Sequence, residues 1–210
     1  MTDTDGAEPR AGCFVVIEGG EGSGKSTQVG LLGERFRAFG RETVVTREPG
    51  GTDRGAQIRK LLLHDHARVD ARAELLLMLA DRAQHVAEVI RPALERGAVV
   101  VSDRFAPSTL TYQGIGRELG VEQVERMSHW ATGGLEPDLV VVLDLADEAA
   151  ALRMTAAPDR LEQAGPEFHA TVREAYRLLA PMYGWVVVDG GGLINDVAEE
   201  VWAAIRTALP

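Results

Sequence analysis

Residues 19–26, Gly-Gly-Glu-Gly-Ser-Gly-Lys-Ser, fit the spacing G-x-x-x-x-G-K-[ST]. An apolar run at 13–18 comes directly before them, and a helical pattern at 25–39 follows. A strand that turns through glycines into a helix directs several backbone N–H groups at one point, where a phosphate group binds. Since strand, loop and helix are all in register, a chance glycine-rich turn explains the spacing poorly. The pattern predicts a nucleoside-triphosphate site.

The loop side chains have separate expected roles. Lys25 brings positive charge to the β- and γ-phosphates, and the hydroxyl of Ser26 can ligate Mg²⁺. The residues predicted to contact ATP are Gly19, Gly20, Glu21, Gly22, Ser23, Gly24, Lys25, Ser26 and Thr27. A GTPase would normally add an Asn-Lys-x-Asp segment, which the sequence lacks. The loop alone does not separate a kinase from a motor or switch ATPase.

The apolar pattern predicts an α/β fold. Strand patterns occur at 13–18, 43–46, 98–103, 138–145 and 185–189, and helical patterns, among them 53–63, 71–95 and 194–209, separate them. Apolar strands that alternate with helices are typical of a parallel sheet covered on both faces. The sequence has no internal repeat and no linker. We therefore expect one domain at 13–210, preceded by a disordered acidic tail at 1–12.

Charge and composition exclude several classes of partner. Lys and Arg number 22 against 32 Asp and Glu, a formal charge of −10. A polyanion needs a broad basic surface, so nucleic acid and anionic membranes are not expected partners. The tail lacks the features of a secretory signal and no apolar segment reaches membrane-spanning length, so we expect a cytoplasmic protein. The single cysteine, Cys13, is expected to be a buried thiol.

Five short motifs occur in one order along the chain. They are Glu-Gly-Gly-Glu-Gly-Ser-Gly-Lys-Ser-Thr at 18–27, Thr-Arg-Glu-Pro-Gly-Gly-Thr at 46–52, Ala-Asp-Arg-Ala-Gln-His at 80–85, Asp103-Arg104-Phe105 with Ser108 and Tyr112-Gln113-Gly114, and Asp-Arg-Leu-Glu at 159–162. With these motifs, from Phe14 to about Tyr183, the chain resembles bacterial thymidylate kinases. The resemblance implies a P-loop kinase with a five-stranded parallel sheet, helices on both faces and a short lid at about 153–161. It also implies a homodimer that moves the γ-phosphoryl group of ATP to dTMP with Mg²⁺, giving dTDP and ADP for dTTP synthesis.

Asp103 and Arg104 stand at the carboxyl end of a predicted strand, where ligands of α/β proteins collect. The planar guanidinium of Arg104 can bridge donor and acceptor phosphates. Asp103 can orient a Mg²⁺-bound water, and the plainer alternative for the pair is a surface salt bridge. Asp144 ends a similar apolar run and is a second Mg²⁺ candidate, ranked lower because no arginine follows it.

Helical spacing groups part of the acceptor site. Met78 and Arg82 are four residues apart on a predicted helix and share a face, as do Ser108 and Tyr112 if the chain after Pro107 is helical. The resemblance implies these substrate contacts: Arg47 to the acceptor phosphate, Arg82 to the pyrimidine base, Tyr112 against C2′ of the deoxyribose, Glu21 to the 3′-hydroxyl, and Met78, Ser108 and Gln113 nearby. The ordinary alternatives are a core aromatic for Tyr112, a helix-surface salt bridge for Arg82, and solvent-facing side chains for Arg47 and Glu21.

Two positions depart from the family pattern. Met78 stands where the family commonly has phenylalanine. The lid segment 153–160 holds only two arginines; we expect Arg160 first and Arg153 second to join Lys25, Asp103 and Arg104 as catalytic groups. The alternatives to a thymidylate kinase are a P-loop kinase for another nucleotide or nucleoside and a non-catalytic ATP-binding switch.

Overall fold

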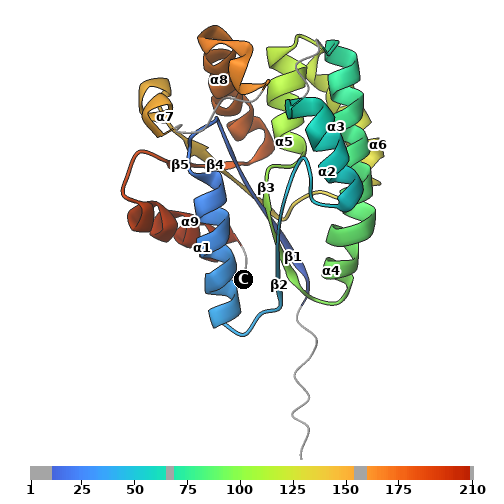
Figure 1. The fold of residues 1–210 in the computed structure, drawn as a ribbon. Coiled ribbons are helices and arrows are strands. Elements are labelled where there is room, and N and C mark those ends of the chain that lie inside the picture. Colours follow the sequence, from blue (N-terminus) through green and yellow to red (C-terminus); the bar gives the residue numbers. More distant parts are fainter. Residues whose placement is uncertain (1–10, 65–68, 154–159, 209–210) are drawn as a thin grey trace, which may run out of the picture.

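The computed structural model describes residues 11–64, 69–153 and 160–208. Its sheet has five parallel strands in the order β2-β3-β1-β4-β5 (Figure 1). The strands are β1 (Cys13–Gly19), β2 (Thr43–Arg47), β3 (Val99–Asp103), β4 (Leu139–Asp144) and β5 (Val186–Asp189). The expected five-stranded parallel sheet is confirmed, and each predicted strand lies within one residue of the observed bounds at both ends.

Helices separate the strands along the chain. In order they are α1 (Lys25–Ala38), α2 (Asp53–Arg59), η1 (Lys60–His64), α3 (Ala71–His85), η2 (Val86–Ile90), α4 (Arg91–Glu95), α5 (Ala106–Thr109), η3 (Leu110–Gly116), α6 (Val121–Thr132), α7 (Asp147–Arg153), η4 (Glu162–Ala164), α8 (Pro166–Tyr183) and α9 (Ile194–Ala208). The segment after Pro107 is therefore helical, and the condition for Ser108 and Tyr112 to share a face is met.

The two faces of the sheet have separate cores. Side chains alternate along β1, so that Val15 and Ile17 face one layer while Phe14 and Val16 face the other. Helices α1 and α9 cover the first layer, and η2, α4 and α8 cover the second (Figure 1). Burial on both faces is the reason that this strand is an uninterrupted apolar run in the sequence.

The helix expected at 71–95 contains a break. Regular α3 gives way to the π-helical turn η2, after which α4 begins with Pro92 in its first turn. Proline has no N–H to donate to the carbonyl four residues earlier, so the regular ladder cannot run through this point. Ile90 and Ala93, on either side of the proline, remain fully buried against the sheet.

Several expectations concern the margins of the fold. Residues 1–10 of the expected tail and 154–159 of the expected lid lie outside the described residues, so the predicted domain limits remain predictions.

Cys13 is only partly buried, and burial together with the charge of Asp138 raises the pKa of its thiol to about 11. Among the described residues, no helix has both the length and the apolar character needed to span a membrane.

Candidate active site

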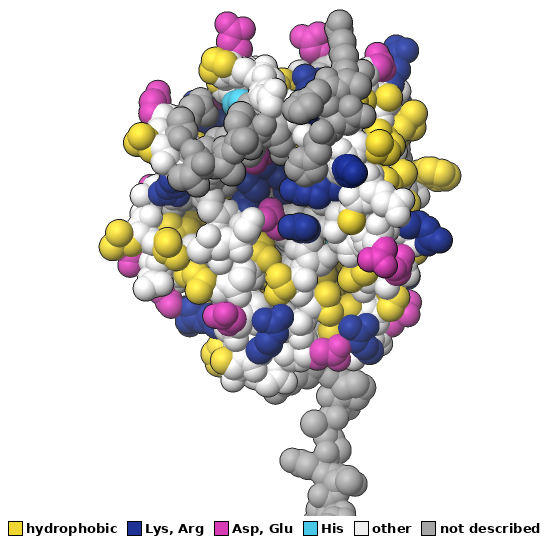
Figure 2. All heavy atoms as spheres, in the orientation of Figure 1, with side chains coloured by type: hydrophobic (Ala, Val, Ile, Leu, Met, Phe, Trp, Pro, Cys, Tyr) yellow, Lys and Arg dark blue, Asp and Glu magenta, His cyan; other side chains and the backbone are white. Residues whose placement is uncertain are grey.

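The loop after β1 forms one wall of a cavity of about 640 Å³. Gly22 and Gly24 have φ values of 68° and 93°, which side chains with a Cβ rarely adopt, so glycine is required for this turn. Residues of the loop, of the strand ends and of the start of α9 line the cavity: Glu21–Gln28, Arg47, Glu48, Arg59, Asp103, Arg104, Arg153, Gly190, Gly192–Ile194 and Val197. Figure 2 shows Lys and Arg side chains gathered around the hollow at the centre of this face.

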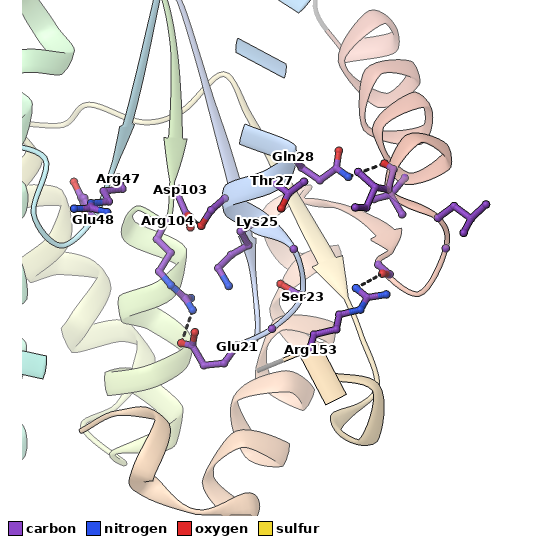
Figure 3. Close-up of a pocket in the computed structure, with 18 of the residues that line it drawn as sticks. Glu21, Ser23, Lys25, Thr27, Gln28, Arg47, Glu48, Asp103, Arg104 and Arg153 are labelled. Carbon is purple, nitrogen blue, oxygen red and sulfur yellow. Dashed lines mark hydrogen bonds and ion pairs between the residues drawn. The ribbon is translucent and has the colours of Figure 1, made fainter. Parts of the chain in front are cut away.

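Lys25 stands in the middle of this cavity wall (Figure 3). It is buried, and its Nζ donates a hydrogen bond to the carbonyl of Gly20 at 2.6 Å. Burial and the nearby charge of Arg104 lower the pKa of Lys25. An anion that entered the cavity would offset both effects, which is the electrostatic arrangement expected of a phosphate site.

Arg104 has an unusual backbone conformation, with φ at 73°. A residue with a Cβ adopts such a conformation at a cost of about 1–3 kcal/mol, and only where its surroundings fix it. Two hydrogen bonds do so here: the N–H of Arg104 donates to the carbonyl of Ile17 at 3.0 Å, and the hydroxyl of Ser102 donates to the carbonyl of Arg104 at 2.8 Å. The strained turn directs the side chain into the cavity (Figure 3).

The Arg104 side chain is 13% exposed and makes several polar contacts. Its Nη2 donates to Oε1 of Glu21 at 2.6 Å and to the hydroxyl of Tyr112 at 3.2 Å, and its Nη1 donates to Ser108 at 3.1 Å. Burial alone would raise the pKa of Glu21, but Arg104, Lys25 and the Tyr112 hydroxyl outweigh it and lower that pKa to about 2. The structure thus brings these predicted residues together, and neither Arg104 nor Glu21 is a solvent-facing side chain.

Glu18 is a site residue that the sequence analysis did not single out. It is fully buried and accepts hydrogen bonds from the N–H of Phe105 (2.8 Å), from the hydroxyl and the N–H of Ser108 (2.6 and 3.2 Å), and from the hydroxyl of Tyr176 (2.7 Å). Burial raises the pKa of Glu18. The charge of Arg104 and the hydrogen bonds from Ser108, Tyr176 and Phe105 oppose this rise. Glu18 therefore fixes the turn that contains Arg104.

Ser26 and Asp103 lie together on the cavity wall. The Ser26 hydroxyl donates to Oδ2 of Asp103 at 2.5 Å. Asp144, the second Mg²⁺ candidate, instead pairs with Arg177 at 2.8 Å and does not line this cavity. Within the described residues, no group of three or more His, Cys, Asp or Glu side chains is placed to hold a metal ion.

A smaller cavity of about 80 Å³ adjoins the first. It is lined by Glu21, Glu48, Pro49, Arg59, Leu63, Met78, Arg82, Arg104, Ser108, Thr109, Tyr112, Gln113 and Leu161. Six of the seven residues predicted for the acceptor are in this set. Arg47, the seventh, lines the larger cavity but not the smaller one, and it is exposed. Within the described part of the chain, its guanidinium makes no hydrogen bond or ion pair, so it is available to an anion.

Arg82 lies in the interior of the protein, 2% exposed. Its Nε pairs with Glu48 at 2.8 Å, and its Nη2 donates to the carbonyl of Phe105 and the hydroxyl of Thr109 at 2.9 and 2.8 Å. The Nη1 has only a 3.5 Å contact, with Ser128. The alternative of a helix-surface salt bridge is therefore wrong: Arg82 lines the smaller cavity and forms a buried ion pair that fixes the loop after β2.

The two expected lid arginines lie in different places. Nη1 of Arg153 donates to the carbonyl of Gly190 at 2.9 Å, across the phosphate loop from Arg104 (Figure 3). Arg153 lines the larger cavity. Arg160 lines neither cavity, because its Nη2 pairs with Glu74 at 2.8 Å. The same Glu74 accepts a 2.8 Å hydrogen bond from Nε2 of Gln113.

Among the described residues, four line both cavities: Glu21, Glu48, Arg59 and Arg104. The sequence analysis did not identify Arg59, whose Nη1 donates to the carbonyl of Pro49 at 2.9 Å. It stands at the end of α2, and its place within an ordinary helical pattern gave no signal. The arrangement offers cations at the boundary between two cavities, which is what the meeting of two phosphorylated ligands requires.

Comparison with known proteins agrees with this geometry. The family model for thymidylate kinase matches residues 17–201. A thymidylate kinase of Leifsonia xyli subsp. xyli is 49% identical over 196 residues, covering 91% of this chain and 93% of the relative. One from Clavibacter sepedonicus is 49% identical over 203 residues, covering 94% and 96%. The crystal structure of thymidylate kinase from Ehrlichia chaffeensis superposes with a TM-score of 0.76 at 28% identity, covering 93% of this chain and 99% of that one. The chain belongs to the thymidylate kinase family.

Proposed function

We propose that this protein transfers the γ-phosphoryl group of ATP to dTMP, giving dTDP and ADP, as a step in dTTP synthesis. The observation that carries the proposal is the pair of adjoining cavities, which share Arg104 and Glu21 at their boundary. The larger cavity contains the phosphate loop and takes ATP. The smaller takes the base and sugar of dTMP, with its phosphate directed toward Arg104.

The chain's own residues position and neutralise the reacting groups. Lys25 and Arg104 face the place where negative charge accumulates during phosphoryl transfer, and Arg47 is free to bind the acceptor phosphate. In-line transfer needs little covalent help from the protein, so fixed cations supply most of the catalysis. The ion pair with Glu21 orients the guanidinium of Arg104 before a substrate binds.

Ser26 and Asp103 fit a Mg²⁺ ion. A hydroxyl and a carboxylate beside the phosphate loop are hard oxygen donors, and Mg²⁺ in such sites takes its remaining ligands from water and phosphate oxygens. When bound, the metal would neutralise charge on the β- and γ-phosphates. We therefore assign Mg²⁺ to this pair, with Ser26 as a ligand and Asp103 as a ligand or as the acceptor of a bound water.

Tyr112 supports discrimination between deoxyribose and ribose. The residue is 4% exposed, and its hydroxyl donates to Glu21 at 3.0 Å while accepting from Arg104. A side chain fixed at both the ring and the hydroxyl cannot move aside for an additional 2′-hydroxyl. The proposal thus includes rejection of ribonucleotides by steric exclusion.

The decisive experiment measures ADP release with ATP and Mg²⁺ for dTMP, dUMP, dCMP, dGMP, dAMP and UMP. We expect dTMP to have a kcat/KM at least about tenfold above every other nucleotide. Preference for another monophosphate would keep the kinase and reject the acceptor assignment. ATP binding without turnover on any acceptor would identify a switch and reject the enzyme.

We further propose that the protein is a cytoplasmic homodimer. Leu61, Leu76 and Trp130 are more than half exposed, and Figure 2 shows hydrophobic side chains along the edge where α3 and α6 lie in Figure 1. Exposed apolar side chains on neighbouring helices fit a subunit interface. Light scattering on a size-exclusion column should give twice the 22.6 kDa chain mass, and a monomer at micromolar concentration contradicts the assignment.

A further inference from the structure

Glu74, in the first turn of α3, joins three segments of the chain. It is 0% exposed and accepts hydrogen bonds from Nε2 of Gln113 (2.8 Å), Nε of Arg117 (3.2 Å) and Nη2 of Arg160 (2.8 Å). Burial by itself raises the pKa of Glu74, but these hydrogen bonds lower it overall, so the carboxyl is charged at neutral pH. A buried charge of this kind is stable only while its partners stay in place.

Arg160 is attached to the acceptor side of the site by more than this ion pair. Its Nε donates to the carbonyl of Leu62 at 2.6 Å, and its backbone N–H donates to the carbonyl of Leu63 at 3.1 Å. The next residue, Leu161, is buried in one cluster with Leu62 and Leu63. Arg160 therefore docks on η1 and α3, away from the cavity that contains the phosphate loop.

These contacts support two walls of the smaller cavity. Leu63, Met78 and Leu161 form its apolar wall, and the position of Leu161 follows from the docking of Arg160. Gln113 belongs to the polar wall. Since the Gln113 amide nitrogen donates to Glu74, the carbonyl end of that amide is left for a ligand.

We propose that Arg160 and Glu74 are positioning residues for the acceptor nucleotide, which act by fixing Leu161 and Gln113 around its base. The inference rests on the proposed function, because it assigns the smaller cavity to the acceptor. It gives Arg160 a different role from the catalytic one expected from the sequence: Arg160 shapes the dTMP site and makes no contact with the transferred phosphoryl group. Arg153 is then the arginine of this pair that serves ATP.

The test compares Arg160→Ala with the wild type in steady-state kinetics and in calorimetric titration with dTMP alone. We expect the KM and the Kd for dTMP to rise about tenfold, while kcat and the KM for ATP change by no more than about threefold. A fall in kcat of about 100-fold with unchanged dTMP binding would mean that Arg160 acts on the transferred group, and would overturn the inference.

Matched variants sharpen the result. Arg153→Ala should raise the KM for ATP and leave dTMP binding unchanged, while Arg126→Ala, an exposed arginine paired with Glu122, should change neither. If Arg160→Ala does not fold, Arg160→Lys serves, since one ammonium cannot reach both Glu74 and the Leu62 carbonyl as the guanidinium does. An unaltered Kd for dTMP in Arg160→Lys and in Glu74→Gln then refutes the proposal.

Failure of the proposed function would look different. If the wild type preferred another monophosphate, the same Arg160 comparison would use that nucleotide, and a selective loss of its binding would support the positioning role. If no acceptor turned over, titration of the wild type and of Arg160→Ala with dTMP would still decide it. Equal affinities would reject the role of Arg160, and a loss of about tenfold in the variant would support it.

Discussion

The guanidinium of Arg104 and the carboxylate of Glu21 are 2.6 Å apart at the boundary of the two cavities. The pair is partly shielded from water, and Tyr112 contacts both members. Arg104 also donates hydrogen bonds to Ser108 and to the carbonyl of Gly19, so its guanidinium is held in one orientation. The reacting phosphates thus meet a cation whose direction is already set.

Arg104→Lys should therefore lower kcat by about 100-fold or more, because the compact ammonium on a flexible chain lacks the planar set of donors with which the guanidinium bridges two phosphates while paired with Glu21. The coupled ADP-release assay measures the effect, and Arg126→Lys is the matched surface control. A kcat within about threefold of the wild type would show that phosphoryl transfer does not need the guanidinium of Arg104.

Tyr176→Phe should lower both the free energy of unfolding and kcat. The change removes the 2.7 Å hydrogen bond to Glu18 and leaves the packing of the ring against Trp185 intact. We expect a loss of about 1–3 kcal/mol in the free energy of unfolding, measured by urea titration, because a buried carboxylate loses a donor. We also expect a lower kcat, because Glu18 fixes the turn at Arg104. Tyr183→Phe, at a partly exposed position nearby, should stay within about 0.5 kcal/mol of the wild type.

Met78→Phe should leave the KM for dTMP equal or lower. Met78 lines the smaller cavity beside Leu63 and Leu161, and a flat ring can cover a base face more rigidly than a thioether. Kinetics with varied dTMP at saturating ATP test this. A large rise in the KM for dTMP would contradict the placement of Met78 against the base.

Asp81 should make stability depend on pH. It is 1% exposed, and its Oδ2 has no hydrogen-bond partner among the residues that the structure describes. Burial and the charge of Glu48 raise the pKa of Asp81 from 3.8 to about 6. Between these two values the folded protein binds more protons than the unfolded chain, so the Asp81 contribution to stability falls as the pH rises from about 4 to about 6.

Asp81→Asn retains the oxygen that accepts from the N–H of Gly50 and removes the charge. As the pH rises from about 4 to about 6, the free energy of unfolding of the variant should increase relative to that of the wild type by on the order of 2 kcal/mol. Urea unfolding at several pH values measures this difference. Asp53→Asn, at an exposed position, is the control. Parallel curves for the wild type and Asp81→Asn would show that Asp81 is charged throughout.

Local patterns predicted the strands and the phosphate loop well because each is defined by neighbours in the sequence. Partners far apart in the sequence were harder to foresee. Arg82 lines the smaller cavity as expected, but its ion pair with Glu48, 34 residues earlier, was not foreseen. Arg160 was expected over ATP, yet it pairs with Glu74, 86 residues earlier. Helical spacing says which side chains share a face but says nothing of the residue that faces them.

Glu18 was missed for a related reason. As the charged residue near the end of a buried strand, it gave a signal, but it was interpreted only as the start of the loop motif. Its partners at 105, 108 and 176 come from two other elements. The pairing of Asp144 with Arg177, a residue of α8, was equally hidden from the strand pattern.

The four residues that line both cavities have a consequence for how the two substrates bind. An acceptor phosphate beside Arg104 and Arg59 changes the charge that the terminal phosphate of ATP meets, and ATP does the same for the acceptor. By thermodynamic linkage, each nucleotide must alter the affinity of the other by one common factor. The sign of that cooperativity reports whether the shared cations or the repulsion between the two anions dominates.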